Sequence, residues 1–233
     1  MTTKGDVFYT LDHGSVELLS IMGNDIDIVN AAKVSFASSI SEMDESGIGL
    51  LNYLLKNKHS TPFEHVVFKF RIKCPIFVAR EWFRHRWSSF NEMSMRYYVP
   101  KELEFYIPDD DCIRKQVGKP GSYQFIPIAD DRVINNTKQL MNSVYEMAES
   151  AYRQLIEDGV AKEIARSILP VGQYTEFIWT VNCRSLLNFL NLRNSPHAQY
   201  EINEYAKIIE NEILAKELPI TYDCFIKNGR ESI

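Results

Sequence analysis

The sequence predicts an α+β fold in which a helix-rich body surrounds a small central sheet. Several long segments repeat apolar residues at helical spacing. Two segments, 66–73 and 174–181, instead alternate apolar and polar residues, as half-buried strands do. Of the 233 residues, 45% are hydrophobic and 24% are charged, which is typical of a globular protein. We therefore expect a single domain over residues 1–233.

The first half of the chain predicts two helices, a strand and a third helix, in that order. Asn24 and Asp25 open the first helix, and the second covers residues 43–57. The buried stripe expected for the second helix is Ile48, Leu51, Leu54 and Leu55. In the strand over 66–73, Phe68, Phe70 and Ile72 share one face. Pro75 suits the first turn of a helix that runs to about His85, and residues 102–108 suggest a short strand.

The second half begins with residues 109–130, whose polar, Gly- and Pro-containing sequence predicts a mobile loop. Residues 131–158 form the longest predicted helix, and Gly159 suits the position after its end. The apolar stripe expected to bury this helix is Val133, Leu140, Val144, Met147, Ala151 and Leu155. A short helix over 161–169, the strand 174–181, and helices over 185–192 and 197–218 complete the prediction.

The charge and the cysteines limit the environment and the partners of the chain. A net charge of −5 argues against bulk binding of nucleic acid or of an anionic membrane. The four cysteines are too far apart for a metal-ligand pattern and predict reduced thiols. No secretory signal core or membrane-length apolar run occurs in the sequence. These features predict a soluble cytoplasmic protein.

The densest polar segment is 84–97, which contains three arginines, a histidine, three serines, an asparagine and a glutamate. Guanidinium groups bind phosphates in bidentate fashion and keep their charge at any working pH. Three of them near one loop can bind a diphosphate or two separate phosphates, and Glu92 can accept hydrogen bonds from a ribose or a pyrimidine. The alternative is a solvated helix end with surface ion pairs.

The same residue types recur in a second group that contains Arg166, Arg184, Asn188 and Arg193. Arg184 and Asn188 are four residues apart on a predicted helix and so share a face. Arg193 lies near the end of that helix, where a cation that complements the helix dipole would be a sufficient explanation.

A third group, 59–65, contains two histidines and a carboxylate. The six-residue spacing of His59 and His65 matches no common zinc motif, so we expect no metal site.

Taken together, these motifs resemble flavin-dependent thymidylate synthases. Arg84-His85-Arg86, seven residues and then Ser94 form the signature of that family. Residues 22–25, 32–36, 59–65, 75–80 and 188–193 resemble further family segments in the family's order, so the resemblance extends from about residue 17 to 225.

The resemblance implies an enzyme of the thymidylate synthase-complementing fold. Such an enzyme methylates dUMP to dTMP, with methylenetetrahydrofolate as carbon donor, NADPH as reductant and FAD as hydride carrier. The resemblance also implies a homotetramer in which each active site is built from several subunits.

Site residues are implied by position. The expected FAD contacts are Ser35, His59, Thr61, Arg84, His85, Arg86, Glu92, Asn182, Cys183, Arg184 and Asn188. The expected dUMP contacts are Glu81, Arg84, Glu92, Met93, Ser94, Met95, Arg96, Arg166 and Arg193. His59 should also lie beside the folate. Glu81 departs from the family pattern, which has Gln, a residue that touches the nucleotide phosphate. A carboxylate there either loses this contact or pairs with a neighbouring arginine.

The implied role of Arg193 has a physical basis, because uracil C5 is a poor nucleophile. A permanent cation at uracil N3 and O4 would stabilise the anionic ring and so activate C5. Ser94 is a candidate nucleophile, but no base with an orienting partner is evident near it in the sequence. We therefore expect Ser94 to position dUMP without forming a covalent bond.

Three other interpretations remain open at this point. A non-catalytic nucleotide- or RNA-binding module could use Arg84, Arg86, Trp87 and Tyr97, because such modules interleave basic and aromatic residues. A family member altered at Glu81 could bind FAD without making thymidylate. A purely structural protein would leave the three polar groups unexplained.

Overall fold

The computed structural model describes residues 5–231. Its strands are β1 (Val7–Thr10), β2 (Gly14–Met22), β3 (Val67–Pro75), β4 (Ser88–Glu92), β5 (Arg114–Lys119), β6 (Ser122–Pro127) and β7 (Tyr174–Asn182). Its α-helices are α1 (Asp25–Lys33), α2 (Glu45–Lys56), α3 (Ile76–Trp82), α4 (Asp131–Glu157), α5 (Lys162–Ala165), α6 (Cys183–Arg193), α7 (Tyr200–Ile208), α8 (Ala215–Glu217) and α9 (Pro219–Lys227). Short 3₁₀ turns are η1 (Val34–Phe36), η2 (Thr61–His65), η3 (Asp110–Cys112) and η4 (Arg166–Ile168), and η5 (Ile209–Leu214) is π-helical.

Within residues 5–231, a five-stranded antiparallel sheet forms the centre of the molecule, with strand order β1-β2-β3-β7-β4. The two strands that the sequence predicts from alternation, β3 and β7, lie side by side in it. The sheet is covered on one face, so Phe68, Phe70 and Ile72 are fully buried while Lys69 and Arg71 alternate with them on the exposed face. The predicted alternation of β3 is therefore confirmed.

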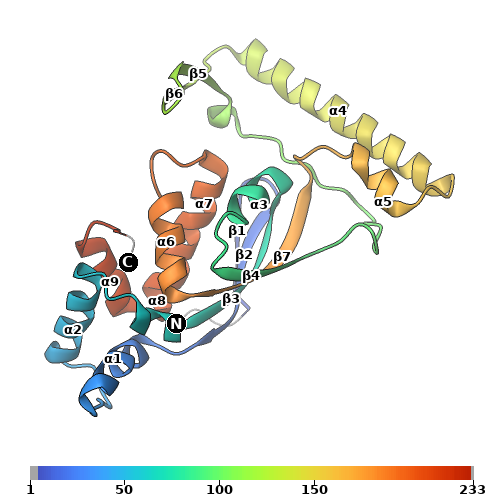
Figure 1. The fold of residues 1–233 in the computed structure, drawn as a ribbon. Coiled ribbons are helices and arrows are strands. Elements are labelled where there is room, and N and C mark those ends of the chain that lie inside the picture. The colour runs from blue at the N-terminus through green and yellow to red at the C-terminus, as the bar shows by residue number, and fades with distance from the viewer. Residues whose placement is uncertain (1–4, 232–233) are drawn as a thin grey trace.

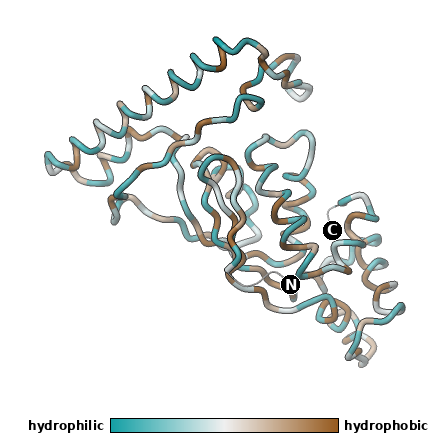
Figure 2. Tube along the Cα trace, turned by 180° about the vertical axis from the view of Figure 1, so that it is seen from behind, coloured by the Kyte–Doolittle hydropathy of each residue, from teal (hydrophilic) through white to brown (hydrophobic). Residues whose placement is uncertain are grey.

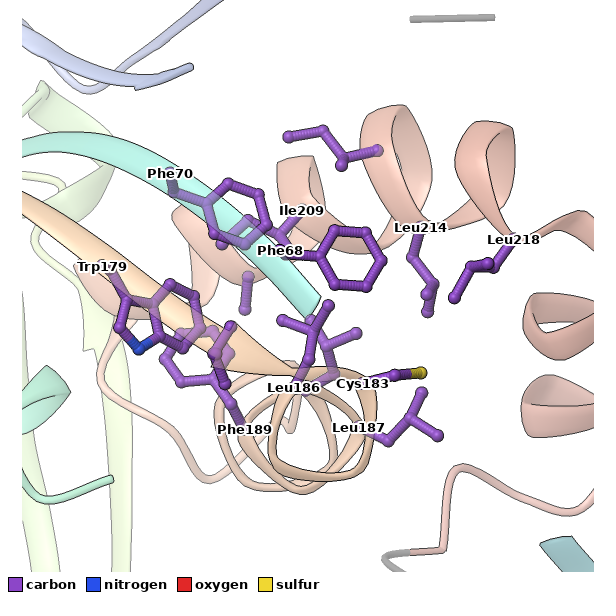
Figure 3. Packing of buried hydrophobic residues seen from close by; sticks show 14 of the residues in the cluster. Phe68, Phe70, Trp179, Cys183, Leu186, Leu187, Phe189, Ile209, Leu214 and Leu218 are labelled. Carbon is purple, nitrogen blue, oxygen red and sulfur yellow. The ribbon is translucent and has the colours of Figure 1, made fainter. Parts of the chain in front are cut away.

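The core lies between this sheet and helices α3, α6 and α7, which pack against its buried face. Figure 3 shows Phe68, Phe70 and Trp179 of the strands beside Leu186 and Phe189 of α6. The apolar side chains of β3 and β7 thus anchor the helix that carries Arg184, Asn188 and Arg193. Because the apolar face of α6 packs against the sheet, the polar face of the same helix is held in a fixed position.

Helices α1, α2 and α9 form one end of the molecule (Figure 1). The predicted start of α1 is confirmed, because the Asn24 side chain caps it and Asp27 completes a capping box. Helix α2 also lies where it was predicted. Leu51, Leu54 and Leu55 are buried as expected, but Ile48 is 41% exposed, because it lines an open cavity between α2 and α9.

At the other end, α4, α5 and the β5–β6 hairpin form an arm that extends away from the sheet (Figure 1). Residues 109–130, expected to be a mobile loop, contain this hairpin, in which every residue from Arg114 to Lys119 pairs with one between Ser122 and Pro127. The positive φ values of Gly118 and Gly121 permit its tight turn. The sequence did not reveal this hairpin because turn-forming residues mark a hairpin connection as well as a loop.

Helix α4 and its end at Gly159, which has φ +78°, are confirmed, but its predicted burial is wrong. Leu140 is 63% exposed and Met147 is 73% exposed, and Val133, Val144 and Ala151 are also exposed. Hydrophobic residues recur along the whole length of this helix (Figure 2). Its other face contacts α5, η4 and residues 95–110, and of the predicted stripe only Leu155 packs there, near Met95. The rest of the stripe has no cover within residues 5–231.

Other boundaries also differ from the predictions. Strands β1, β2 and β4 were not predicted. The alternation of β2 is interrupted by a bulge between Leu18 and Ser20, and β4 lies within the polar segment 84–97. Residues 102–108 contribute only an isolated bridge between Phe105 and Gln173. The helix expected over 197–218 is divided by the π-helical turn η5, and α9 follows it. No helix in the described part of the chain is long and apolar enough to cross a bilayer.

Candidate functional site

The Arg84-His85-Arg86 segment begins at one of the most firmly packed points of the core. Trp82, the last residue of α3, is fully buried against the rings of Phe177, Trp179 and Phe189. The backbone N–H of His85 then donates to the Trp82 carbonyl at 3.0 Å, and Ser88 Oγ donates to the His85 carbonyl at 2.6 Å. These bonds hold a tight connection between α3 and β4, so its side chains project from a fixed base.

This connection and helix α6 enclose a cavity of about 440 Å³. The cavity is lined by Arg84, His85, Arg86, Trp87, Ser88, Val181, Arg184, Ser185, Asn188, Leu192 and Arg193. Six of these residues were predicted site residues from two distant segments of the sequence. The fold therefore brings together two of the three polar groups.

Helix α6 lines the cavity because of its local sequence. Asn182 caps its first turn by accepting a hydrogen bond from the Ser185 backbone N–H at 2.9 Å. Arg184, Asn188 and Leu192 then follow at four-residue intervals and share one helix face. The opposite face, with Leu186, Leu187 and Phe189, is fully buried. The predicted shared face of Arg184 and Asn188 is confirmed.

Four guanidinium groups line the cavity, and they differ in their partners. Arg184 Nη1 donates to Glu64 Oε1 at 2.5 Å, and Arg193 Nη1 donates to Glu81 Oε2 at 2.8 Å. Arg84 and Arg86 are exposed, and their side chains form no hydrogen bond or ion pair with any residue between 5 and 231. The cavity thus offers two uncompensated positive charges, which suit an anionic ligand.

His85 is a neutral acceptor in this cavity. Its Nε2 accepts a hydrogen bond from Arg193 Nε at 3.0 Å, and its ring contacts Phe189 at a centroid distance of 5.0 Å. Burial, and secondly the charge of Arg193, lower the pKa of His85 from 6.5 to about 4. The imidazole is therefore uncharged near neutral pH, and Nδ1 carries its proton.

A second cavity, of about 580 Å³, lies at the other end of β4. Its lining includes the predicted residues Glu92, Met93, Met95 and Arg166, together with Arg80 and Thr175. Thr175 Oγ1 donates to Glu92 Oε1 at 2.8 Å and so orients that carboxylate. Strand β4 begins at Ser88 in the first cavity and ends at Glu92 in the second, a span of about 13 Å.

The remaining predicted residues lie outside both linings. Ser94 Oγ accepts from the Arg96 backbone N–H at 3.3 Å, and Arg96 pairs with Glu163 at 3.3 Å. Ser35, His59 and Thr61 are exposed, near α1 and η2. His59 stacks on Tyr53. Cys183 is wholly buried, so its side chain does not reach the cavity. Residues 5–231 contain no group of three His, Cys, Asp or Glu side chains placed to bind a metal.

Several lining residues were not singled out in the sequence. Ser185 and Leu192 could have been found from the helical spacing of Arg184 and Asn188. Ser88 lies in the polar segment but was not assigned a contact. Glu64, the partner of Arg184, lies 120 residues from it, and no sequence signal indicates that pairing.

The chain matches the family described as "Thymidylate synthase complementing protein" over residues 17–220. Its relatives include the flavin-dependent thymidylate synthase of Thermosipho africanus, which is 46% identical over 93% of this chain and 92% of that protein. Another, from Thermus thermophilus, is 43% identical over 92% of this chain and 76% of that protein. The chain belongs to the flavin-dependent thymidylate synthase family. It is therefore an enzyme, as its sequence predicts.

A solved structure of this family supports the α+β fold class. The UMP/dUMP methylase PolB of Streptomyces cacaoi, bound with 5-Br UMP, is 36% identical to this chain, with a TM-score of 0.85. The match covers 96% of this chain and 98% of PolB. The complex of PolB with 5-Br dUMP gives a TM-score of 0.86. The predicted helix-rich fold around a small sheet is thus confirmed.

Proposed function

We propose that this enzyme methylates dUMP to dTMP, with methylenetetrahydrofolate as carbon donor, FAD as hydride carrier and NADPH as reductant. The observation that carries this proposal is the cavity between the α3–β4 connection and α6. It combines the guanidiniums of Arg84 and Arg86, which have no partner among residues 5–231, with that of Arg193, held by Glu81 and His85. The family membership and the names of the relatives support the same reaction.

The residues of the cavity fit a flavin dinucleotide. Arg84 and Arg86 supply the charge that a diphosphate requires, and Trp87, 81% exposed, offers an aromatic face. The residues that would hold FAD are Ser35, His59, Thr61, Arg84, His85, Arg86, Glu92, Asn182, Cys183, Arg184 and Asn188. Cys183 would act through its backbone, because its side chain is buried. A bound flavin supplies hydride chemistry that no side chain can.

The role proposed for Arg193 is electrostatic. Its guanidinium is permanently charged and lines the cavity, where it would stabilise the negative charge that develops on uracil N3 and O4. Ser94 would position dUMP. Its hydroxyl oxygen accepts a backbone hydrogen bond, and no hydrogen bond to a general base is present within residues 5–231.

The proposed active site is shared between copies of the chain. Residues expected to contact dUMP divide between two cavities at opposite ends of β4, which is about 13 Å long: Arg84 and Arg193 line one, and Glu92, Met93, Met95 and Arg166 line the other. A nucleotide held by both sets requires the second cavity of another copy. The exposed stripe of α4 provides apolar surface for such an assembly, which we propose is the homotetramer.

The first test is a visible absorbance spectrum of the purified protein, recorded anaerobically with NADPH and with or without dUMP. We expect bound oxidised flavin that is bleached by NADPH, and dTMP when methylenetetrahydrofolate is added. UMP should be compared with dUMP, because the related PolB is named for both nucleotides. Mass spectrometry of the turnover mixture should find no nucleotide attached to Ser94.

The outcomes discriminate between the interpretations. A protein that stays colourless after incubation with FAD would exclude flavin chemistry and favour a nucleotide- or RNA-binding module. In that case oligonucleotide binding should depend steeply on salt. A yellow protein that makes no dTMP would point to the substitution at Glu81.

A further inference from the structure

The guanidinium of Arg193 is held in place by two residues. Nη1 donates to Glu81 Oε2 at 2.8 Å, Nη2 donates to the Glu81 carbonyl at 3.2 Å, and Nε donates to His85 Nε2 at 3.0 Å. Each nitrogen of the group therefore has a separate acceptor. Because a guanidinium is planar, three such contacts define both its position and its plane.

Two N–H groups of Arg193 remain available for a ligand. A guanidinium has five, and three are used by these contacts within residues 5–231. The Arg193 side chain is 20% exposed and that of Glu81 is 32% exposed, so the pair lies at the edge of the cavity rather than in open solvent. The Glu81 contacts therefore determine which donors of Arg193 face the cavity.

The carboxylate of Glu81 also changes the charge that the cavity presents. Arg84 and Arg86 have no counter-ion within the described residues, whereas the charge of Arg193 is offset by a carboxylate in direct contact. An anion that approaches Arg193 therefore meets a nearly neutral pair and gains less attraction than it does at Arg84 or Arg86.

We propose that Glu81 is a positioning residue that directs the Arg193 guanidinium toward the nucleotide and weakens the attraction of this part of the cavity for the nucleotide anion. This inference rests on the proposed function, because it assigns dUMP as the ligand of Arg193. It assigns to the Glu at this position a role distinct from contact with the phosphate.

The two effects can be separated with two substitutions. Glu81→Gln keeps an oxygen that accepts from Nη1 but removes the charge, whereas Glu81→Ala removes both. We expect both variants to bind dUMP about three- to fivefold more tightly, because both remove the carboxylate. We expect Glu81→Ala to lose roughly tenfold in kcat, because a misdirected Arg193 stabilises the transition state poorly. Glu81→Gln should recover most of that loss.

The experiment measures the Kd of dUMP by calorimetry on the FAD-loaded enzyme, and kcat by dTMP formation. Glu17→Gln is the matched control. Glu17 accepts from Arg71 Nη1 at 2.9 Å in a similar Glu–Arg pair on the sheet, and it lines neither cavity. This control should leave both Kd and kcat unchanged. The melting temperature of each variant shows whether Glu81 serves stability alone.

Tighter dUMP binding in both variants, with a kcat loss only in Glu81→Ala, supports the proposal. Equal kcat values in the two variants, or unchanged Kd values, overturn it. The proposal also fails if both variants lose melting temperature to the same extent and do not differ in kcat, because Glu81 and Arg193 would then be a merely structural pair. If the unmodified protein neither binds dUMP nor makes dTMP, the proposed function fails together with this inference. If the unmodified protein is active but the Glu81 variants have its Kd and kcat, only the inference fails.

Discussion

At the scale of single residues, the cavity is organised by carboxylates from outside its lining. Glu64 of η2 and Glu81 of α3 each hold one guanidinium, and neither carboxylate itself lines the cavity. Both pairs keep some contact with solvent, and ion pairs that do so stabilise a protein by only about 1 kcal/mol. The two ion pairs therefore affect ligand binding more than stability, because they fix the positions of the Arg184 and Arg193 guanidiniums.

Replacement of Arg193 tests its assigned electrostatic role. Arg193→Ala should retain FAD, because Arg84 and Arg86 still bind the diphosphate, but should lose about 10²- to 10³-fold in kcat. Flavin content comes from the visible spectrum, and turnover comes from dTMP formation. A variant with full turnover would return Arg193 to the simpler role of a cation at a helix end.

The lowered pKa of His85 predicts a dependence of stability on pH. As pH falls below 6.5, the unfolded chain binds a proton at this histidine before the folded chain does. The free energy of unfolding should therefore decrease between pH 6.5 and about 4, by at most about 1.4 kcal/mol per pH unit from this group. Urea unfolding at several pH values measures it.

The control for His85 is the variant His85→Asn, which cannot titrate in this range. Carboxylates contribute equally to both proteins, so the stability advantage of the unmodified protein should shrink as pH falls from 6.5 to 4. A difference that stays constant across this range would show that His85 has an ordinary pKa.

At the same scale, the sequence located the charged residues of the site but not their pairings. Arg84, His85 and Arg86 are adjacent, and Arg184 and Asn188 share a helix face, so local rules suffice to group them. The Glu81–Arg193 contact joins residues 112 positions apart, and the sequence left open whether Glu81 pairs with an arginine, without indicating which one. Only the tertiary fold decides such pairings.

At the scale of elements, strong periodicity predicted well and weak periodicity did not. The sequences of β3 and β7 alternate cleanly because one face of the sheet is buried. In β4 only Ser88 and Phe90 are partly buried, so its sequence resembles that of a polar loop. The α4 stripe was recognised correctly as apolar. Its burial was mispredicted because periodicity identifies a face and not what covers it.

The start of α9 depends on a carboxylate from α1, which gives a prediction about stability. Asp25 is 6% exposed and accepts hydrogen bonds from Ile220 N, Thr221 N and Thr221 Oγ1 at 3.1, 2.9 and 2.6 Å. Asp25→Ala should lower the free energy of unfolding by about 2–3 kcal/mol, because buried donors lose their acceptor. Chemical denaturation measures this change.

The matched control is Asp27→Ala, two residues later on the same helix. Asp27 is exposed and, among the described residues, its carboxylate accepts only the Asn24 backbone N–H, so its loss should cost about 1 kcal/mol or less. Equal effects of the two substitutions would show that the contact between α1 and α9 contributes nothing beyond local capping.

At the scale of the whole molecule, the arm that carries α4 supports the proposed assembly of several copies. Its exposed stripe includes Leu140 and Met147 at helical spacing, and exposed apolar patches of this kind mark interaction sites. The double substitution Leu140→Glu and Met147→Glu should reduce the molar mass measured by light scattering. Circular dichroism should remain unchanged, because neither residue contributes to the core. An unchanged mass would place the subunit interface elsewhere.

Shared active sites predict complementation between two inactive variants. Arg193→Ala damages the first cavity and Arg166→Ala damages the second. If each site combines the first cavity of one copy with the second cavity of another, random mixing should leave about a quarter of the sites intact. Co-expression of the two variants with different affinity tags, followed by tandem purification of mixed assemblies, gives the material for the dTMP assay.

The expected recovery depends on where the two halves of a site come from. When both cavities of one chain serve the same site, every site in a mixed assembly carries one damaged half, and the activity stays at the level of the separate variants. The control mixes two copies of the same variant with different tags, which should recover nothing. Recovery in the mixture alone would show that one nucleotide spans the first cavity of one copy and the second cavity of its partner.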